Sequence, residues 1–183
     1  ERVAERTARV ARVWPQVQTR PIDISFNFSV PSLLFVRLPK WYALMRFNKP
    51  EQIMANLKDQ NTRDTLIAEA QGMMPLWNNL VLRQVVSEAN QELVGKTLKE
   101  IAALRQSDAL NVMIDLSLEE SLEAHFLSAD MGHNDDALVA PLLKHPNVMI
   151  GASDGGAHIL SFATYGDTGY LLGHFVRDTA HLG

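Results

Sequence analysis

The chain of 183 residues contains no cysteine, which excludes disulfide bonds and every thiolate metal site. Histidine, aspartate and glutamate remain as the side chains that could hold a metal ion. Only 10 glycines and 8 prolines are present, so collagen-like and low-complexity architectures are excluded as well. A cysteine-free composition suits a reducing compartment, and we therefore expect the protein in the cytoplasm.

An excess of charge of one sign and long apolar runs are also missing. The 17 Lys and Arg residues against 21 Asp and Glu residues give a formal net charge of -4, which offers no basic footprint for nucleic acid. No apolar stretch approaches the roughly 20 residues that span a bilayer. The charged start, with Glu1, Arg2, Glu5 and Arg6, does not resemble a signal peptide. We expect a soluble protein that binds neither nucleic acid nor a membrane.

What the chain does have is enough apolar sequence for one core. Hydrophobic residues make up 46% and charged residues 21%, close to the average for globular domains. The chain opens without Met and stops at Gly183 while helical periodicity is still running. We therefore expect a fragment of a longer protein.

Several segments are predicted to form strands. The apolar run 13–17 is expected to be a short strand, with Pro15 at an edge or at its end because proline cannot donate to a sheet ladder. The run 147–152, between Pro146 and a glycine-rich turn, is typical of a buried parallel strand. Residues 77–89 are predicted to be a strand too. Apolar and polar residues alternate over residues 22–30, which predicts an extended segment with one buried face formed by Ile22, Ile24, Phe26, Phe28 and Val30.

Helices are predicted in the first half of the chain as well. Residues 1–12 have the pattern of an amphipathic helix. Prolines and aromatic residues over residues 31–50 indicate an irregular connection. Pro50 suits the first turn of a helix, because the N–H that proline lacks would be unpaired there anyway. A further helix is predicted over residues 61–72.

Two capping-box patterns favour helices over residues 97–127. Thr97 and Glu100 can exchange hydrogen bonds at a helix start, and Ser117 and Glu120 repeat the spacing ahead of a helix that would carry His125. A helix is expected from about residue 134 to 145, although an interior Pro141 would cost about 3 kcal/mol. Another is expected from about residue 168. The order of helices and strands at both ends of the chain predicts an α/β fold.

The loop after the predicted strand at 147–152 is the most informative segment; it reads Gly151-Ala152-Ser153-Asp154-Gly155-Gly156-Ala157-His158. In parallel α/β folds, the loops at the C-terminal ends of the strands converge on a cleft, and a Gly-Gly turn lets the backbone approach a ligand. Asp154 is therefore a candidate cleft carboxylate. The alternative is that Asp154 or Ser153 only turns the chain by bonding to the backbone.

The same loop allows two further hypotheses. Gly151, Ser153 and Gly155 match the G-x-S-x-G nucleophile elbow, which would make Ser153 the nucleophile of a serine hydrolase. That mechanism also needs an acid and a histidine later in the chain, and the available candidates fall within one predicted helix. The other hypothesis is a non-catalytic, helix-rich interaction domain that merely carries a glycine-rich turn.

Short stretches along the chain carry a family resemblance, and they are Pro15-Gln16-Val17, Arg20-Pro21, Leu57-Lys58-Asp59, Arg63, Gly95-Lys96-Thr97-Leu98, Asp115-Leu116, Lys144-His145-Pro146 and the run 151–158. Because these stretches occur in this order, the sequence resembles the N-acyl-D-amino-acid deacylase, or D-aminoacylase-like, branch of the amidohydrolase superfamily. The resemblance covers nearly the whole chain. Its most specific piece is the run from Ser153 to His158 after a strand.

The resemblance implies the last strands of a metal-dependent (β/α)8 TIM barrel with a helix-rich insertion. Residues 1–30 would be the region of strand seven, residues 31–146 the mainly helical insertion, and residues 147–183 the last strand, the catalytic loop and the following helix. The implied reaction is hydrolysis of the C–N bond in N-acyl-D-amino acids or related small N-acylated substrates. Self-association of the chain as a homo-oligomer is expected, because unpaired barrel edges seek partners.

The resemblance also implies roles for the loop residues. Asp154 would be a metal ligand and the base that takes a proton from water, beside one or two Zn²⁺ ions that lower the pKa of that water. The family's His-x-His pair has no counterpart here, so most metal ligands would come from outside this chain. We therefore expect the isolated chain to be inactive.

Residues expected to contact the substrate lie on both sides of the predicted cleft. His158 would point into it as a substrate contact or cap the turn, and its neighbours Ser153, Gly155 and Gly156 would line the same loop. Arg20, just beyond the strand at 13–17, could pair with a substrate carboxylate, because a guanidinium matches a carboxylate in shape and charge. The alternative for Arg20 is a surface ion pair.

Overall fold

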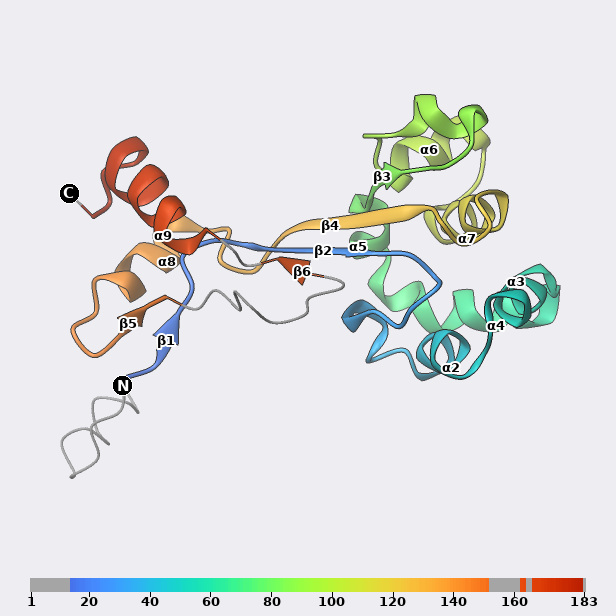
Figure 1. Cartoon of the computed structure of the whole chain (residues 1–183), viewed down its shortest axis with the longest axis horizontal. Helices are drawn as coiled ribbons and strands as arrows, with labels where there is room; N and C mark the ends of the chain where they lie inside the picture. The colour runs from blue at the N-terminus through green and yellow to red at the C-terminus, as the bar shows by residue number, and fades with distance from the viewer. Residues whose placement is uncertain (1–13, 152–161, 164–165, 183) are drawn as a thin grey trace. The chain divides into compact units, whose positions relative to one another are not determined.

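The computed structural model describes residues 14–151, 162–163 and 166–182 (Figure 1). Within these ranges the chain forms eight α-helices and six strands, and the strands pair in both parallel and antiparallel fashion. The mixed α/β class predicted from the sequence is therefore confirmed. The described strands do not close into a barrel. The helix predicted for residues 1–12 lies outside the described ranges.

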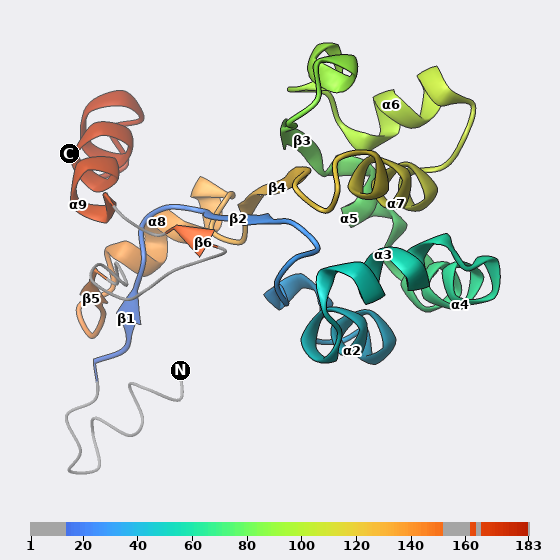
Figure 2. The ribbon, with the colours of Figure 1, turned by 45° about the vertical axis from the view of Figure 1, so that its right-hand side comes forward.

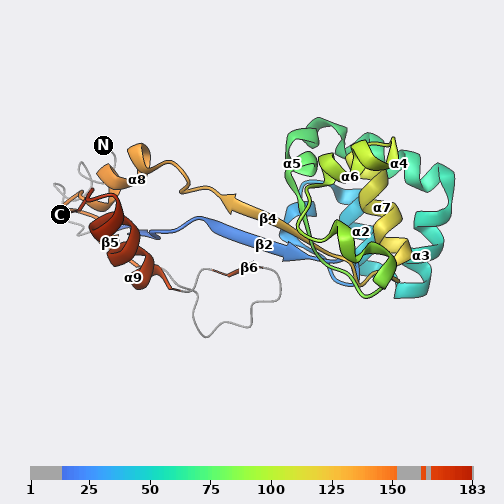
Figure 3. The same cartoon turned by 90° about the horizontal axis from the view of Figure 1, so that it is seen from above.

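Two compact units make up the chain. Unit 1 consists of Glu1–Asp23 and Asp130–Gly183, and unit 2 of Ile24–Ala129. The chain passes from one unit to the other within strands β2 (Ile22–Phe26) and β4 (His125–Met131). These strands are neighbours in a four-stranded sheet of order β3-β4-β2-β6, and Figure 3 shows that they run in opposite directions. Among the described helices, none has both the length and the apolar character needed to cross a membrane.

Unit 1 is built around a short parallel sheet. β1 (Gln16–Val17) pairs in parallel with β5 (Met149–Ile150), as Figure 1 shows. The described part of the unit also contains β6 (Phe162–Ala163), α8 (Asp136–Leu143), α9 (Asp167–Tyr170) and the π-helical stretch η4 (Leu171–Asp178) that continues α9. Its core joins α8 to η4 through Val139, Ala140, Leu143 and Phe175. The prediction of a parallel strand near residue 150 is confirmed.

The burial predicted for that strand is wrong. The side chains of Met149 and Ile150 are 50% and 38% exposed. A sheet of two strands with two paired residues each is too small for both of its faces to be enclosed. The apolar composition of residues 147–152 therefore identified the extended conformation but not the environment.

Unit 2 is mainly helical (Figure 2). Its strand β3 (Val81–Gln84) pairs antiparallel with β4 and confirms a strand within residues 77–89. The helices are α2 (Pro39–Phe47), α3 (Pro50–Lys58), α4 (Gln60–Ala70), α5 (Met74–Asn79), α6 (Leu98–Arg105) and α7 (Ala109–Glu119). Short 3₁₀ turns precede α2 at η1 (Leu33–Phe35), join α4 to α5 at η2 (Gln71–Met73) and follow β3 at η3 (Glu88–Leu93).

The core of unit 2 is aromatic. The alternation predicted over residues 22–30 is confirmed as an extended strand only from Ile22 to Phe26, where Ile24 and Phe26 are buried. Residues 28 and 29 form a turn that still buries Phe28, and the burial predicted for Val30 is wrong because that residue is 41% exposed. Phe35 lies at the centre, with ring centroids 5.2 to 5.5 Å from its aromatic neighbours Phe26, Trp41 and Trp77. Both indoles are fully buried and donate to backbone carbonyls, Trp41 Nε1 to Leu66 at 2.7 Å and Trp77 Nε1 to Ala70 at 2.8 Å. Buried indoles need such partners.

Local helix signals were reliable at two starts. Pro50 is the first residue of α3, as predicted. The capping box of α6 is present, because the Glu100 N–H donates to Thr97 Oγ1 at 3.2 Å and the Thr97 N–H donates to Glu100 Oε2 at 2.7 Å. The helix predicted near residues 134–145 is α8, which begins at Asp136 and keeps Pro141 inside.

Two other predictions are wrong. Residues 39–47 form α2 rather than an irregular connection. The second capping box is absent, because Ser117 lies inside α7 and its hydroxyl donates to Met113 O at 2.8 Å. α7 ends at Glu119, the chain turns through residues with positive φ at Ser121 and Leu122, and His125 belongs to β4 instead of a helix.

Candidate functional site

The loop on which the sequence hypothesis depends is mostly outside the described residues. Ser153, Asp154, Gly155, Gly156 and His158 all fall within residues 152–161, which the structure does not describe. Their roles therefore stay predictions. The last described residue before them is Gly151, whose φ of 120° is a conformation that glycine adopts easily.

The parallel strands fix where this loop starts. The Met149 N–H donates to Pro15 O and the Gly151 N–H donates to Val17 O, each at 3.0 Å. In this register Val17 lies opposite Ile150, so the two strands end together. Because the strands are parallel, the segments that follow them, from residue 18 and from residue 151, leave the same edge of the sheet.

The edge is joined to α9 by a buried polar contact. Thr19 is fully buried, its N–H donates to Asp167 Oδ1 at 3.3 Å and its hydroxyl donates to Asp167 O at 2.9 Å. Asp167 is the first residue of α9 and is itself buried. These bonds hold the start of α9 next to the end of β1, although more than a hundred residues separate the two segments in the sequence.

Arg20 lies at this edge, three residues after β1. Its Nη2 contacts Asp23 Oδ2 at 3.2 Å, and its Nε donates to Pro21 O at 3.3 Å. The other carboxylate oxygen of Asp23 accepts the Asp130 N–H at 3.1 Å. Arg20 therefore forms the surface ion pair that was one of its two predicted roles. Its side chain is also 26% exposed, and the other predicted role, binding a substrate carboxylate, requires such access to solvent.

A polar hollow of about 720 Å³ opens in unit 1 beside Arg20. It is within the size range of small-molecule sites, roughly 300–1,000 Å³. Residues from β4, α8, α9 and η4 contribute to its lining, together with the segment after β1. The polar side chains in its lining are those of Asp130, Asn134, Asp135, Asp136, Tyr170 and His174.

An imidazole and a carboxylate are paired in this hollow. His174 Nε2 lies 2.8 Å from Asp136 Oδ2, and both side chains are about 30% exposed. The Tyr170 ring stacks on the imidazole with centroids 4.8 Å apart. His181 Nε2 lies 3.9 Å from the same Asp136 oxygen. In the sequence, His174 was one of several acid and histidine candidates within a single predicted helix, whereas the structure places it in a half-buried pair with Asp136.

The electrostatics of the hollow keep Tyr170 protonated. Burial raises the pKa of its phenol above the ordinary value of 10.0, and the carboxylates of Asp136 and Asp130 raise it further. The Arg20 guanidinium acts in the opposite direction. At neutral pH the phenol is therefore a hydrogen-bond donor rather than a base, and the charge of Arg20 is felt inside the hollow.

The described residues do not fit the implied zinc ion. Over residues 14–151, 162–163 and 166–182, no three His, Asp or Glu side chains are placed to hold a metal ion. Zinc in a catalytic site usually takes three protein ligands. In the hollow, Asp136 is instead paired with His174. The assignment of a metal to Asp154 stays a prediction from the family resemblance.

Sequence reasoning identified Arg20 but missed its neighbours in the hollow. Asp136 and His174 are separated by 38 residues and lie on two different helices, so no motif connects them. The spacing of Tyr170 and His174, four residues apart on a helical stretch, was the only local signal that their rings could meet.

Comparisons with known proteins do not assign this chain to a family. No protein-family model, no curated protein and no solved structure matches the sequence or the fold. Function has to be inferred from the motifs and from the geometry of unit 1.

Proposed function

We propose that the chain is part of an amidohydrolase, similar to the D-aminoacylase-like branch, that hydrolyses the amide bond of N-acyl-D-amino acids or related N-acyl compounds. The observation that supports this proposal is the parallel pairing of β1 with β5. The resemblance treats these two strands as neighbours in a barrel, the seventh and the eighth. Their adjacency is not a local property of the sequence, because more than a hundred residues lie between them.

The register brings the two predicted substrate elements to one edge. Arg20 follows Val17 by three residues, and Asp154 follows Ile150 by four. An extended chain advances at most about 3.6 Å per residue, so covalent geometry alone keeps Asp154 within roughly 14 Å of the end of its strand. A small N-acylated amino acid could bridge a carboxylate-binding arginine and a catalytic carboxylate over such a span.

In the proposed reaction, the Arg20 guanidinium binds the substrate carboxylate and orients the amide. Asp154 accepts a proton from the attacking water and passes it to the leaving nitrogen. A C–O bond forms as the C–N bond breaks, and the products are a carboxylic acid and a free amino acid. The described residues form no zinc site, so no step is assigned to a metal ion.

The serine-hydrolase alternative also has one observation in its favour. The His174–Asp136 pair supplies a hydrogen-bonded imidazole and carboxylate in unit 1, which is the support that a serine nucleophile requires. The chain order is unusual for a nucleophile elbow, because Asp136 precedes Ser153. In that case Ser153 would attack the substrate and His174 would accept the proton from its hydroxyl.

Substitutions at two adjacent residues distinguish the two mechanisms. In the longer parent protein, we predict that Asp154→Asn abolishes hydrolysis of N-acetyl-D-amino acids and that Ser153→Ala keeps substantial activity. A chelator should inactivate that protein, because the family resemblance implies zinc ligands that lie mostly outside this chain. Loss of activity in Ser153→Ala and His174→Ala, with indifference to chelator and covalent labelling of Ser153, would establish the serine mechanism instead. Activity in none of these proteins would favour the interaction-domain hypothesis.

A further inference from the structure

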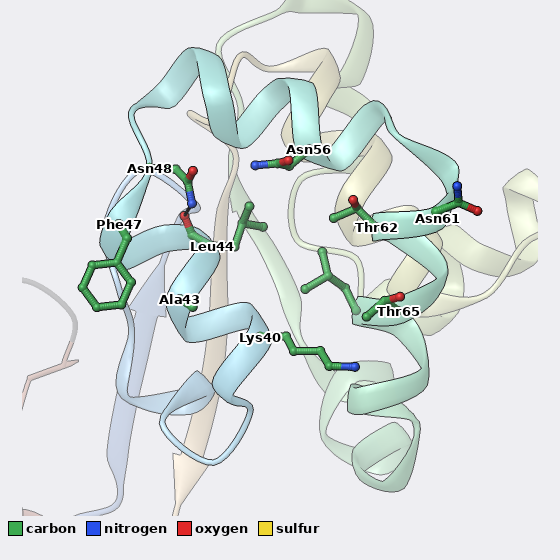
Figure 4. Close-up of a pocket in the computed structure, with 10 residues that line it drawn as sticks. Lys40, Ala43, Leu44, Phe47, Asn48, Asn56, Asn61, Thr62 and Thr65 are labelled. Carbon is green, nitrogen blue, oxygen red and sulfur yellow. Dashed lines mark hydrogen bonds between the residues drawn. The ribbon is translucent and has the colours of Figure 1, made fainter.

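A second pocket lies entirely within unit 2, between α2, α3 and α4 (Figure 4). Its volume is about 490 Å³, which is within the range of small-molecule sites. No residue of this pocket belongs to the hollow in unit 1. The site is therefore independent of the proposed hydrolase chemistry.

The floor of the pocket is apolar and firmly packed. Leu44 of α2 and Leu66 of α4 contribute to it, and both are buried in the core, at 6% and 2% exposure. The packing beneath them is fixed by the indole of Trp41, which is fully buried and bonded to Leu66 O. The floor is thus a preformed surface that an apolar ligand group could cover without rearranging the helices.

The walls supply neutral hydrogen-bonding groups. Figure 4 shows Asn56 of α3 and Thr62 of α4 turned toward the space between the helices. Thr62 is bonded to Asp59, with its hydroxyl 2.8 Å from Asp59 Oδ2. Among the described residues, the side chains of Asn56 and Thr65 have no hydrogen-bond partner, although Asn56 is half-buried. These two side chains are available to a ligand.

Among the described residues that line the pocket, Lys40 is the charged one. Lys40 of α2 extends along its lower side toward Thr65 (Figure 4). Within the part of the chain that the structure describes, the Lys40 ammonium has no ion-pair partner. Glu69 does not neutralise it by contact, because that carboxylate accepts the backbone N–H groups of Lys40 and Trp41 at 3.0 and 3.3 Å. Of the lining residues that the structure describes, none is Asp or Glu.

We propose that this pocket binds a small organic acid that carries a neutral hydroxyl or amide group and a short apolar body. The carboxylate pairs with the Lys40 ammonium, the neutral group bonds to Asn56 and Thr65, and the apolar body covers Leu44 and Leu66. A cationic ligand is disfavoured, because the lining has a positive charge and no negative one. A purely apolar ligand would leave the Asn56 amide without a partner in a half-buried position.

A titration followed by amide NMR shifts tests this site. The probe is leucic acid, the α-hydroxy analogue of leucine, which has a carboxylate, a hydroxyl and an isobutyl group but no amide that the proposed hydrolase could cleave. We expect saturable shifts confined to α2, α3 and α4. The neutral primary amide of leucic acid should bind about two- to fivefold more weakly, because it lacks the charge that pairs with the exposed Lys40 ammonium.

Matched variants separate the site from general charge effects. Lys40→Met should weaken leucic acid binding about two- to fivefold, the size expected for an exposed ion pair, whereas Lys58→Met, an exposed lysine in the last turn of α3 outside the pocket, should leave it unchanged. Ala43→Phe, which narrows the pocket, should abolish binding. Unchanged fluorescence of the buried Trp41 and Trp77 would verify that each variant is folded. Shifts that do not saturate, that spread over both units, or that persist equally in Lys40→Met would overturn the proposal.

Discussion

Replacing Glu120 by glutamine should remove a buried carboxylate that joins the end of α7 to the segment after β3. Glu120 is 4% exposed and accepts the N–H of Val86 at 2.6 Å, the N–H of Ser87 at 2.8 Å and the side-chain amide of Asn90 at 2.6 Å. The Ser87 hydroxyl donates to the same carboxylate. Glutamine would present an NH2 group to donors and lose part of this set.

The size of the effect follows from the pKa of Glu120. Burial is the largest single influence and raises it, but the hydrogen bonds from Asn90, Ser87 and Val86 together lower the pKa from 4.5 to about 2. At about 1.4 kcal/mol per pKa unit, the ionised carboxylate stabilises the folded state by roughly 3 kcal/mol. Because the folded-state pKa is depressed, this stabilisation is complete above the unfolded value of 4.5 and is lost as the pH falls through about 2.

Urea unfolding followed by tryptophan fluorescence measures this contribution, since Trp41 and Trp77 are both buried in unit 2. The free energy of unfolding of the unaltered chain should fall by roughly 3 kcal/mol more than that of Glu120→Gln between about pH 5 and pH 2. Glu119→Gln is the control. Its carboxylate is 42% exposed and pairs with Arg105, so its effect should be about 0.2–1 kcal/mol. Parallel pH profiles for Glu120→Gln and the unaltered chain would refute this reasoning.

Two further predictions concern the core and the candidate site. Phe35→Ala, at the centre of the aromatic core, should lower the free energy of unfolding by about 3–5 kcal/mol in the same urea assay, whereas Phe47→Ala, whose side chain is 78% exposed, should change it by less than about 0.5 kcal/mol. In the longer parent protein, Arg20→Met should raise KM for N-acetyl-D-amino acids about tenfold with little change in kcat, and an equal loss for substrates without a carboxylate would contradict the role of Arg20.

Features with a local physical cause could be predicted from the sequence. The capping box of α6 was identified because its partners, Thr97 and Glu100, are only three residues apart. The start of α3 was identified because the ring of Pro50 alone favours the first turn of a helix. The alternation identified the strand at residues 22–26 because burial in a sheet repeats every second residue, but it continued past the end of the strand into the turn at residues 28–29.

Features fixed by distant partners could not be predicted. The start of α2 is capped by Glu69, which follows Lys40 by 29 residues, so the prolines and aromatics of that region indicated a loop. Ser117 and Glu120 matched a capping box by spacing, but Glu120 is committed to the segment at residues 86–90 and Ser117 to Met113. Spacing alone does not say which of two competing partners a side chain takes.

In the candidate site, too, local features could be predicted and distant pairings could not. Arg20 could be proposed from its place after a strand, and its partner Asp23 is local. The His174–Asp136 pair depends on the packing of η4 against α8 and was missed. Asp154, Ser153 and the rest of their loop stay predictions from motif and resemblance.

The most direct test of the proposed function is the reaction itself. The longer parent protein, incubated with N-acetyl-D-leucine and separately with N-acetyl-L-leucine, should release acetate and free leucine in equal amounts, with the D substrate hydrolysed faster. Such a result would show that the chain belongs to an amide hydrolase selective for D configuration. Absence of acetate from both substrates, under conditions in which the protein is folded and supplied with Zn²⁺, would contradict the proposed function.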